Sequence, residues 1–205
     1  MIIKVCGIIE EDNLIQVCKA DIDMVGLNFF PKSKRYLKEP INVSIIPSSI
    51  KKVGVFVNED LSKVMDTVEE YHLDFVQLHG HESEEYCFEI GPKTKVIKAL
   101  AISDVEDFET ASNYSTVEYF LFDTKSNTWG GSGRKFNWSI LEHYRGEIPF
   151  LLAGGIKADD VEGIKEINHP KFVGVDINSR FEIYPGIKNM PEVHKFAFAL
   201  KNDSY

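Results

Sequence analysis

The chain of 205 residues is long enough to bury one sizeable core, and 43% of its residues are hydrophobic. A net charge of −9 excludes the broadly basic surface that nucleic-acid binding requires. Three scattered cysteines without CxxC spacing argue against a disulfide framework or a structural zinc site. Because neither a signal peptide nor ~18 consecutive apolar residues can be recognised, we expect a cytoplasmic protein with small-molecule partners, and neither nucleic acid nor membrane.

Eight short apolar, β-branched or aromatic runs recur along the chain, and each has the composition of a strand. They span residues 2–6, 24–29, 53–57, 75–79, 96–100, 119–123, 150–153 and 172–176. Several runs are apolar on both faces, which is typical of a parallel sheet that is covered on both sides. Helices must then cover the outside of the sheet.

Seven amphipathic stretches separate these runs and predict helices. They span residues 11–20, 61–71, 83–90, 105–112, 138–144, 159–167 and 191–200. Between residues 40 and 49, Pro40 and Pro47 allow only a short helical turn or two. The alternation predicts an α/β protein with one (β/α)8 TIM-barrel domain over residues 1–205. The alternative is an open doubly wound sheet, which normally has a glycine-rich turn after its first strand. Here Gly154-Gly155 follows the seventh run.

Polar residues close four of the expected strands: Cys6, His79, Asp123 and Asp176. In a TIM barrel the active site forms at the C-terminal ends of the strands, so these side chains should converge. They supply a possible base, a possible acid and two hydrogen-bonding groups, which is the composition of a proton-transfer site. Any one of them alone could be an ordinary polar strand end. We expect Cys6 to be partly exposed, and the other two cysteines to be core residues.

Anion-binding groups are expected in the loops that follow strands seven and eight, where many TIM barrels bind phosphate. Gly154 and Gly155 allow close approach of the backbone, while Ser179 and Arg180 can donate hydrogen bonds. Cations also occur in two other loops, at Lys32, Lys34, Arg35, Lys125, Arg134 and Lys135. At the barrel mouth they would attract an anionic substrate, although each lysine alone fits an ordinary solvated loop equally well. The glycine-rich residues 130–133 are either a lid or a long connection.

The sequence resembles the phosphoribosylanthranilate isomerase family over nearly its whole length. The resemblance rests on the order and spacing of short motifs at residues 4–8, 30–36, 53–58, 76–80, 123–138, 152–155, 175–182 and 185–186. It implies an Amadori rearrangement of N-(5-phosphoribosyl)anthranilate in tryptophan biosynthesis, without metal or organic cofactor. One departure concerns the phosphate loop, where Asn178-Ser179-Arg180 stands in place of the Ser-Ser-Gly of many relatives.

The resemblance also implies roles for single residues. Asp123 would be the general acid that opens the sugar ring, and Cys6 the general base that removes the C2′ proton. Arg35 would hold the anthranilate carboxylate, and the loops that carry Gly154, Gly155, Ser179 and Arg180 would hold the phosphate. Gln77, His79 and Asp176 are further substrate contacts.

Two other functions stay open at this level. One is another sugar-phosphate isomerase or epimerase on the same barrel, such as the histidine-pathway isomerase, which uses two aspartates where this chain has Cys6 and Asp123. The other is a barrel that binds sugar phosphates without turnover. The sequence is compatible with a monomer or a homodimer.

Overall fold

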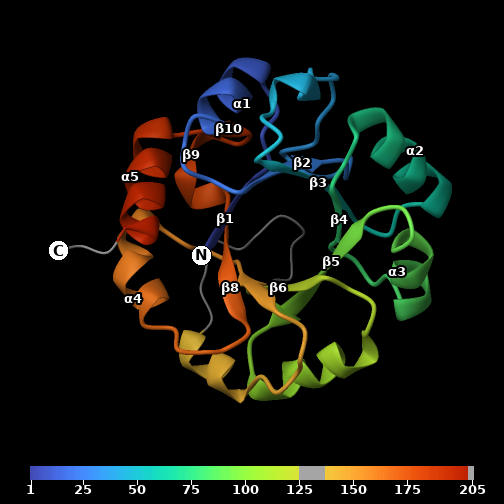
Figure 1. Cartoon of the computed structure of the whole chain (residues 1–205), viewed down its shortest axis with the longest axis vertical. Coiled ribbons are helices and arrows are strands. Elements are labelled where there is room, and N and C mark those ends of the chain that lie inside the picture. The colour runs from blue at the N-terminus through green and yellow to red at the C-terminus, as the bar shows by residue number, and fades with distance from the viewer. Residues whose placement is uncertain (125–136, 203–205) are drawn as a thin grey trace.

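A closed barrel of eight parallel strands forms the centre of the computed structural model, which describes residues 1–124 and 137–202 (Figure 1). The strands are β1 (Ile2–Cys6), β2 (Met24–Asn28), β3 (Lys51–Phe56), β4 (Phe75–Leu78), β5 (Lys95–Ile102), β6 (Tyr119–Thr124), β7 (Phe150–Leu152) and β8 (Phe172–Ile177). Each strand pairs with the next along the chain, and β8 pairs with β1 to close the barrel. The predicted (β/α)8 fold is therefore confirmed, and no strand starts or ends more than two residues from its predicted position.

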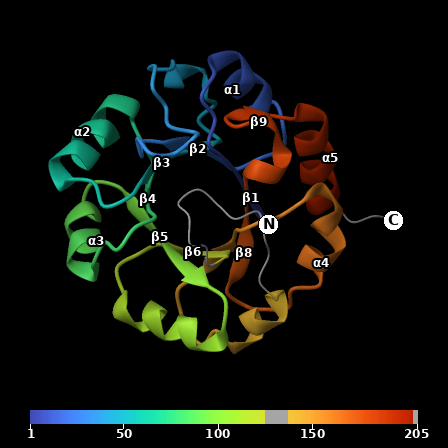
Figure 2. The ribbon, with the colours of Figure 1, turned by 180° about the vertical axis from the view of Figure 1, so that it is seen from behind.

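Helices surround the barrel on all sides in both ribbon views (Figures 1 and 2). The α-helices are α1 (Glu11–Val17), α2 (Leu61–Tyr71), α3 (Glu84–Ile90), α4 (Val161–Lys165) and α5 (Met190–Lys201). Short 3-10 helices are η1 (Val43–Ile45), η2 (Val105–Asn113), η3 (Trp138–His143), η4 (Ala158–Asp160) and η5 (Ser179–Phe181). The prediction of no more than a turn or two between Pro40 and Pro47 is confirmed by η1.

Two details differ from the sequence-based expectation. The helices expected at residues 105–112 and 138–144 are 3-10 helices instead of α-helices. In η2 the buried residues Phe108 and Ala111 lie three apart, and a helix with three residues per turn aligns them on one side. A small hairpin of β9 (Glu182–Tyr184) and β10 (Ile187–Lys188) follows β8 and was not predicted, because strands this short give no periodic pattern.

The hydrophobic core has two layers. The larger one lies between strands and helices, and the smaller one fills the barrel interior with residues such as Met24, Val53, Ile97, Leu121 and Leu151. Alternate residues of each strand face these two layers. The interior is thus packed, and the C-terminal strand ends are left for polar side chains.

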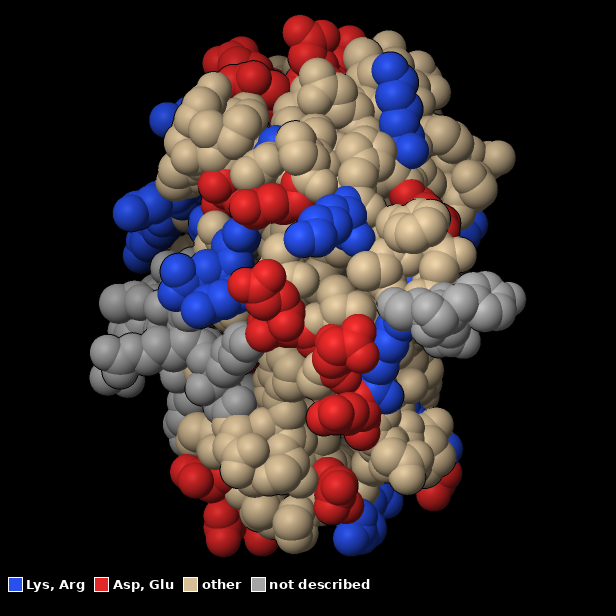
Figure 3. Space-filling model, turned by 90° about the vertical axis from the view of Figure 1, so that its left-hand side faces the viewer, with Lys and Arg blue, Asp and Glu red and all other residues tan. Residues whose placement is uncertain are grey.

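The side of the barrel that carries α5 presents acidic and basic side chains interspersed with each other (Figure 3). This view shows no broad patch of a single charge among the described residues. No helix within residues 1–124 and 137–202 combines the length and the apolar character that crossing a membrane would require.

Candidate active site

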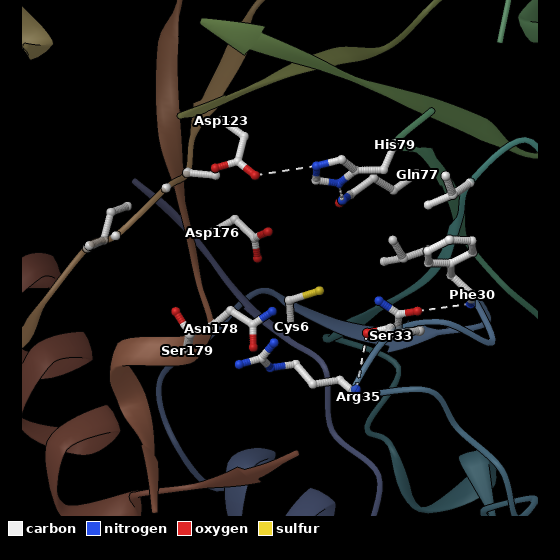
Figure 4. Close-up of a pocket in the computed structure, with 17 residues that line it drawn as sticks. Cys6, Phe30, Ser33, Arg35, Gln77, His79, Asp123, Asp176, Asn178 and Ser179 are labelled. Carbon is white, nitrogen blue, oxygen red and sulfur yellow. Dashed lines mark hydrogen bonds and ion pairs between the residues drawn. The ribbon is translucent and has the colours of Figure 1, made fainter. Parts of the chain in front are cut away.

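The C-terminal strand ends enclose a cavity of about 850 Å³, including its open mouth (Figure 4). Nine of the ten predicted site residues line it: Cys6, Arg35, Gln77, His79, Asp123, Gly154, Gly155, Asp176 and Ser179. The tenth, Arg180, is exposed and is not among the lining residues, so the structure does not bring it to this cavity. The expectation that strand ends from distant parts of the chain converge is confirmed.

Cys6 lies at the end of β1 with its sulfur directed into the cavity (Figure 4). Its register partner on β2 is Gly26, where a Cβ atom would lie 2.7 Å from Sγ, so the missing side chain makes room for the thiol. The expectation of partial exposure was wrong, since Cys6 is only 4% exposed. Burial raises the pKa of the Cys6 thiol, and the nearby charge of Lys4 acts against this effect.

Asp123, at the end of β6, belongs to a chain of three hydrogen-bonding side chains. His79 Nε2 lies 3.3 Å from Asp123 Oδ2, and His79 Nδ1 lies 3.0 Å from Gln77 Nε2. An amide nitrogen is a donor, so His79 Nδ1 accepts this bond and Nε2 carries the hydrogen that faces Asp123. The other carboxylate oxygen of Asp123 accepts a hydrogen bond of 2.8 Å from the backbone N–H of Thr124.

Gly154 shapes the same side of the cavity. It has a φ of +86°, and a Cβ atom there would lie 2.7 Å from Asp123 Oδ1 and overlap Thr124. Only glycine combines this backbone conformation with such close approach to the carboxylate. The double glycine after the seventh strand therefore helps to position Asp123, in addition to any contact with a ligand.

Asp176 lies between Asp123 and Cys6 in the close-up view (Figure 4). Its Oδ1 atom accepts a 3.0 Å hydrogen bond from Lys4 Nζ, and the two residues are register partners on β8 and β1. The lysine side chain is fully buried, and Asp176 is 8% exposed. Burial raises the pKa of the Asp176 carboxyl, while the Lys4 ammonium opposes the shift.

Arg35 is held by Glu182 through two hydrogen bonds. The distances are 2.8 Å from Nε to Oε1 and 2.6 Å from Nη2 to Oε2. Lys188 Nζ donates to the same Glu182 at 2.8 Å and to Asn178 at 2.7 Å. Two cations thus share one buried carboxylate, which leaves one positive charge in excess where both cations are protonated.

The loops after β7 and β8 line another part of the cavity. Gly154 and Gly155 have φ angles of +86° and +67°, and Ser179 begins η5 beside them in the cavity wall. Successive backbone N–H groups in such loops are suited to anions. Lys32 and Lys34 are exposed, while Ser33 and Phe30 of the same loop line the cavity.

Several expectations fall on residues that the structure does not describe. The cations Lys125, Arg134 and Lys135 and the glycine-rich residues 130–133 lie outside the described residues. Within the two described ranges, no group of three or more His, Cys, Asp and Glu side chains is arranged to hold a metal ion.

Sequence reasoning did not assign three residues of the buried charge network: Lys4, Glu182 and Lys188. For Lys4 a signal existed, because a charge inside the apolar run Ile2-Ile3-Lys4-Val5 needs a buried partner. Glu182 and Lys188 gave no such signal. Both belong to the unpredicted hairpin, in which Lys188 pairs with Glu182 and Glu182 in turn binds Arg35.

Fold and cavity together define a TIM-barrel protein whose strand ends gather ionisable and hydrogen-bonding side chains around one cavity. The family model described as N-(5'phosphoribosyl)anthranilate (PRA) isomerase matches residues 3–198. A relative named N-(5'-phosphoribosyl)anthranilate isomerase from Parabacteroides distasonis is 45% identical, over 96% of this chain and 91% of its own. One of the same name from Phocaeicola vulgatus is 39% identical over 98% of both chains.

Solved structures agree with these sequence relatives. The phosphoribosyl anthranilate isomerase of Thermotoga maritima has a TM-score of 0.83 and 34% identity, with 98% of this chain and 99% of that chain covered. A phosphoribosyl anthranilate isomerase in complex with reduced 1-(o-carboxyphenylamino)-1-deoxyribulose 5-phosphate has a TM-score of 0.80 and 31% identity at the same coverage. The chain belongs to the N-(5'-phosphoribosyl)anthranilate isomerase family and is an isomerase.

Proposed function

We propose that this isomerase converts N-(5'-phosphoribosyl)anthranilate to 1-(2-carboxyphenylamino)-1-deoxyribulose 5-phosphate, with Asp123 as general acid and Cys6 as general base. The observation that carries the proposal is that both side chains line one cavity, Cys6 from β1 and Asp123 from β6 (Figure 4). A substrate in this cavity can contact both groups without any movement of the strands. General acid–base catalysis requires such simultaneous reach.

The reaction begins at Asp123. Its carboxylic acid protonates the ring oxygen of the furanose, and the ring opens to an iminium ion. His79 Nε2 lies 3.3 Å from one oxygen of this carboxyl group and the backbone N–H of Thr124 donates to the other at 2.8 Å, which holds the group in place at the cavity wall. After proton transfer, the hydrogen on His79 Nε2 stabilises the carboxylate that remains.

Cys6 acts in the second step. The iminium ion makes the C2′ proton acidic, and the thiolate of Cys6 removes it to give an enolamine, which tautomerises to the ketone. Burial raises the pKa of the Cys6 thiol in the protein without substrate. The positive charge of the iminium group acts in the opposite direction and favours the thiolate. The substrate thus contributes to activating its own base.

The two anionic ends of the substrate match two parts of the cavity wall. Arg35, oriented by Glu182, is suited to the anthranilate carboxylate, and Phe30 in the same wall to the aromatic ring. The backbone around Gly154 and Gly155, together with Ser179, is suited to the phosphate. Gln77 is 1% exposed and its Oε1 has no partner among the described residues, so it is available to a substrate hydroxyl.

The test is the decay of the fluorescence of freshly generated phosphoribosylanthranilate with wild type, Cys6→Ser and Asp123→Asn, without added metal. We expect rapid loss with wild type and loss at least ~100-fold slower with each variant, as is typical for a general acid or base. No turnover by wild type would contradict the assigned substrate. Wild-type rates in either variant would contradict the assigned residue.

A further inference from the structure

A lysine in the interior of this barrel is unusual, because other interior positions form an apolar cluster with residues such as Met24 and Val53. Lys4 is fully buried and precedes Cys6 by two residues on β1, so both side chains face the interior. Replacement of a buried ion pair by apolar residues is often neutral or stabilising. The pair of Lys4 and Asp176 is therefore not explained by stability alone.

The charged groups that act on Cys6 come from three strands. Lys4 lies two residues before Cys6 on the same face of β1 and carries the largest charge effect on the thiol, ahead of Asp176 on β8 and Lys188 on β10. β2 contributes no charge, because the partner of Cys6 there is Gly26. Across the cavity, Asp123 and His79 face each other at 3.3 Å, and Arg35 is engaged by Glu182.

Lys4 and Asp176 act on the thiol in opposite directions. The ammonium group lowers the pKa of Cys6 and the carboxylate raises it. Desolvation lowers the pKa of the buried Lys4 ammonium, but the charges of Asp176, at 3.0 Å, and of Cys6 outweigh it and bring the pKa above its ordinary value, so the thiolate itself also favours the protonated lysine. A permanent cation next to a thiol is the general means by which proteins stabilise a thiolate.

We propose that Lys4 is a positioning residue of the reaction, which stabilises the Cys6 thiolate by its charge, and that Asp176 sets the strength of this effect by sharing that charge. This inference rests on the proposed role of Cys6 as the base. It extends the site from the residues that line the cavity, Asp176 among them, to Lys4, which is paired with Asp176 and is not a lining residue.

The experiment measures the pKa of Cys6 in the intact protein, from the pH dependence of its alkylation by iodoacetamide followed by peptide mass spectrometry. We expect Lys4→Met to raise this pKa by about one unit or more, which means at least about tenfold less thiolate below the pKa. Asp176→Asn should lower it, and the double variant should lie between the two. The low-pH limb of kcat/KM should move in parallel.

Two controls separate this effect from a general loosening of the structure. Lys98→Met removes another buried lysine, which is paired with Glu82 at 3.1 Å and is not among the groups that act on Cys6. We expect it to destabilise the fold and to leave the pKa of Cys6 unchanged. Cys18, which is partly exposed, reports on alkylation in the same samples, and its pKa should stay constant in all variants.

Shifts of the Cys6 pKa in the same direction in Lys4→Met and Asp176→Asn, or no shift in either, would overturn the inference. If Lys4→Met does not fold, Asp176→Asn decides alone, because only a charge effect predicts a lowered pKa for it. A failure of the proposed function looks different. In that case Cys6→Ser retains turnover, whatever the thiol pKa does in the other variants.

Discussion

Replacement of Glu182 by glutamine tests the buried charge network beneath the cavity. The carboxylate accepts hydrogen bonds from Arg35 at 2.8 and 2.6 Å, from Lys188 at 2.8 Å and from the backbone of Gly186 at 3.0 Å. Glutamine keeps the shape and loses the charge, so that two buried cations remain without a counter-ion. Breaking a buried ion pair in this way costs about 3 kcal/mol of unfolding free energy or more.

The loss of stability in Glu182→Gln should depend on pH, and the pKa of Glu182 determines in which direction. Burial alone raises the pKa of Glu182, but the hydrogen bonds and charges of Arg35 and Lys188 outweigh it and bring the pKa below its ordinary value. A carboxyl with a lowered pKa contributes stability above its unfolded pKa of ~4.3, and this contribution is lost as the pH falls through the folded-state pKa. The difference between wild type and Glu182→Gln is therefore full at pH 7 and shrinks below about pH 4.

Urea unfolding followed by circular dichroism, at several pH values between 3.5 and 7, measures both effects. The matched control is Glu118→Gln, which breaks an exposed ion pair with Lys95 and should cost less than about 1 kcal/mol. A cost for Glu182→Gln no larger than that of the control, or one that does not shrink in acid, would refute the reasoning. The variant should also raise KM, because Arg35 loses the group that orients it.

Three further outcomes follow from the geometry. Gly26→Ala brings a methyl group to 2.7 Å from Cys6 Sγ, and we expect kcat to fall at least about tenfold while the circular dichroism spectrum stays unchanged. An unaltered kcat would contradict the inference that Gly26 makes room for the thiol. Cys87 is buried and its pKa is raised to about 12, so in native protein at pH 8 it should resist iodoacetamide, and rapid labelling would speak against its burial. His79→Ala removes the group that faces Asp123 and should lower kcat roughly ten- to hundredfold with little change in KM, whereas a change confined to KM would assign His79 to binding alone.

The barrel could be predicted from the sequence because its signals are local. Runs such as Val53–Phe56 are apolar on both faces and are separated by amphipathic stretches, and in four of the runs a polar residue marks the C-terminal strand end. Cys6 and Asp123 could be placed at one cavity in this way although they lie 117 positions apart, since closure of the barrel brings all strand ends together.

Other features depend on contacts that no local pattern encodes. The bond from Arg35 to Glu182 joins residues 147 positions apart, and the hairpin that provides Glu182 is too short to show a period. The prediction that Arg35 holds the anthranilate carboxylate therefore did not include Glu182, the residue that orients the guanidinium group. For Arg180, the sequence indicates a place after the eighth strand but does not show that the residue is exposed.

The burial of Cys6 was missed for a related reason. Its position at a strand end suggested access to solvent, but the register places it beside Gly26, and the ion pair of Lys4 and Asp176 closes the barrel beneath it. The burial of Cys6 and the charges around it thus depend on residues of several strands. A single strand could not have revealed them.

The most direct test of the acid and base roles is the deuterium isotope effect at C2′ of the substrate, compared between wild type, Cys6→Ser and Asp123→Asn. If Cys6 removes the C2′ proton, its replacement by the weaker base serine makes this step slower and the isotope effect on kcat rises above the wild-type value. If Asp123 opens the ring, its replacement slows the earlier step and the isotope effect falls toward unity. An isotope effect that falls in Cys6→Ser or rises in Asp123→Asn would contradict the assignment of base and acid.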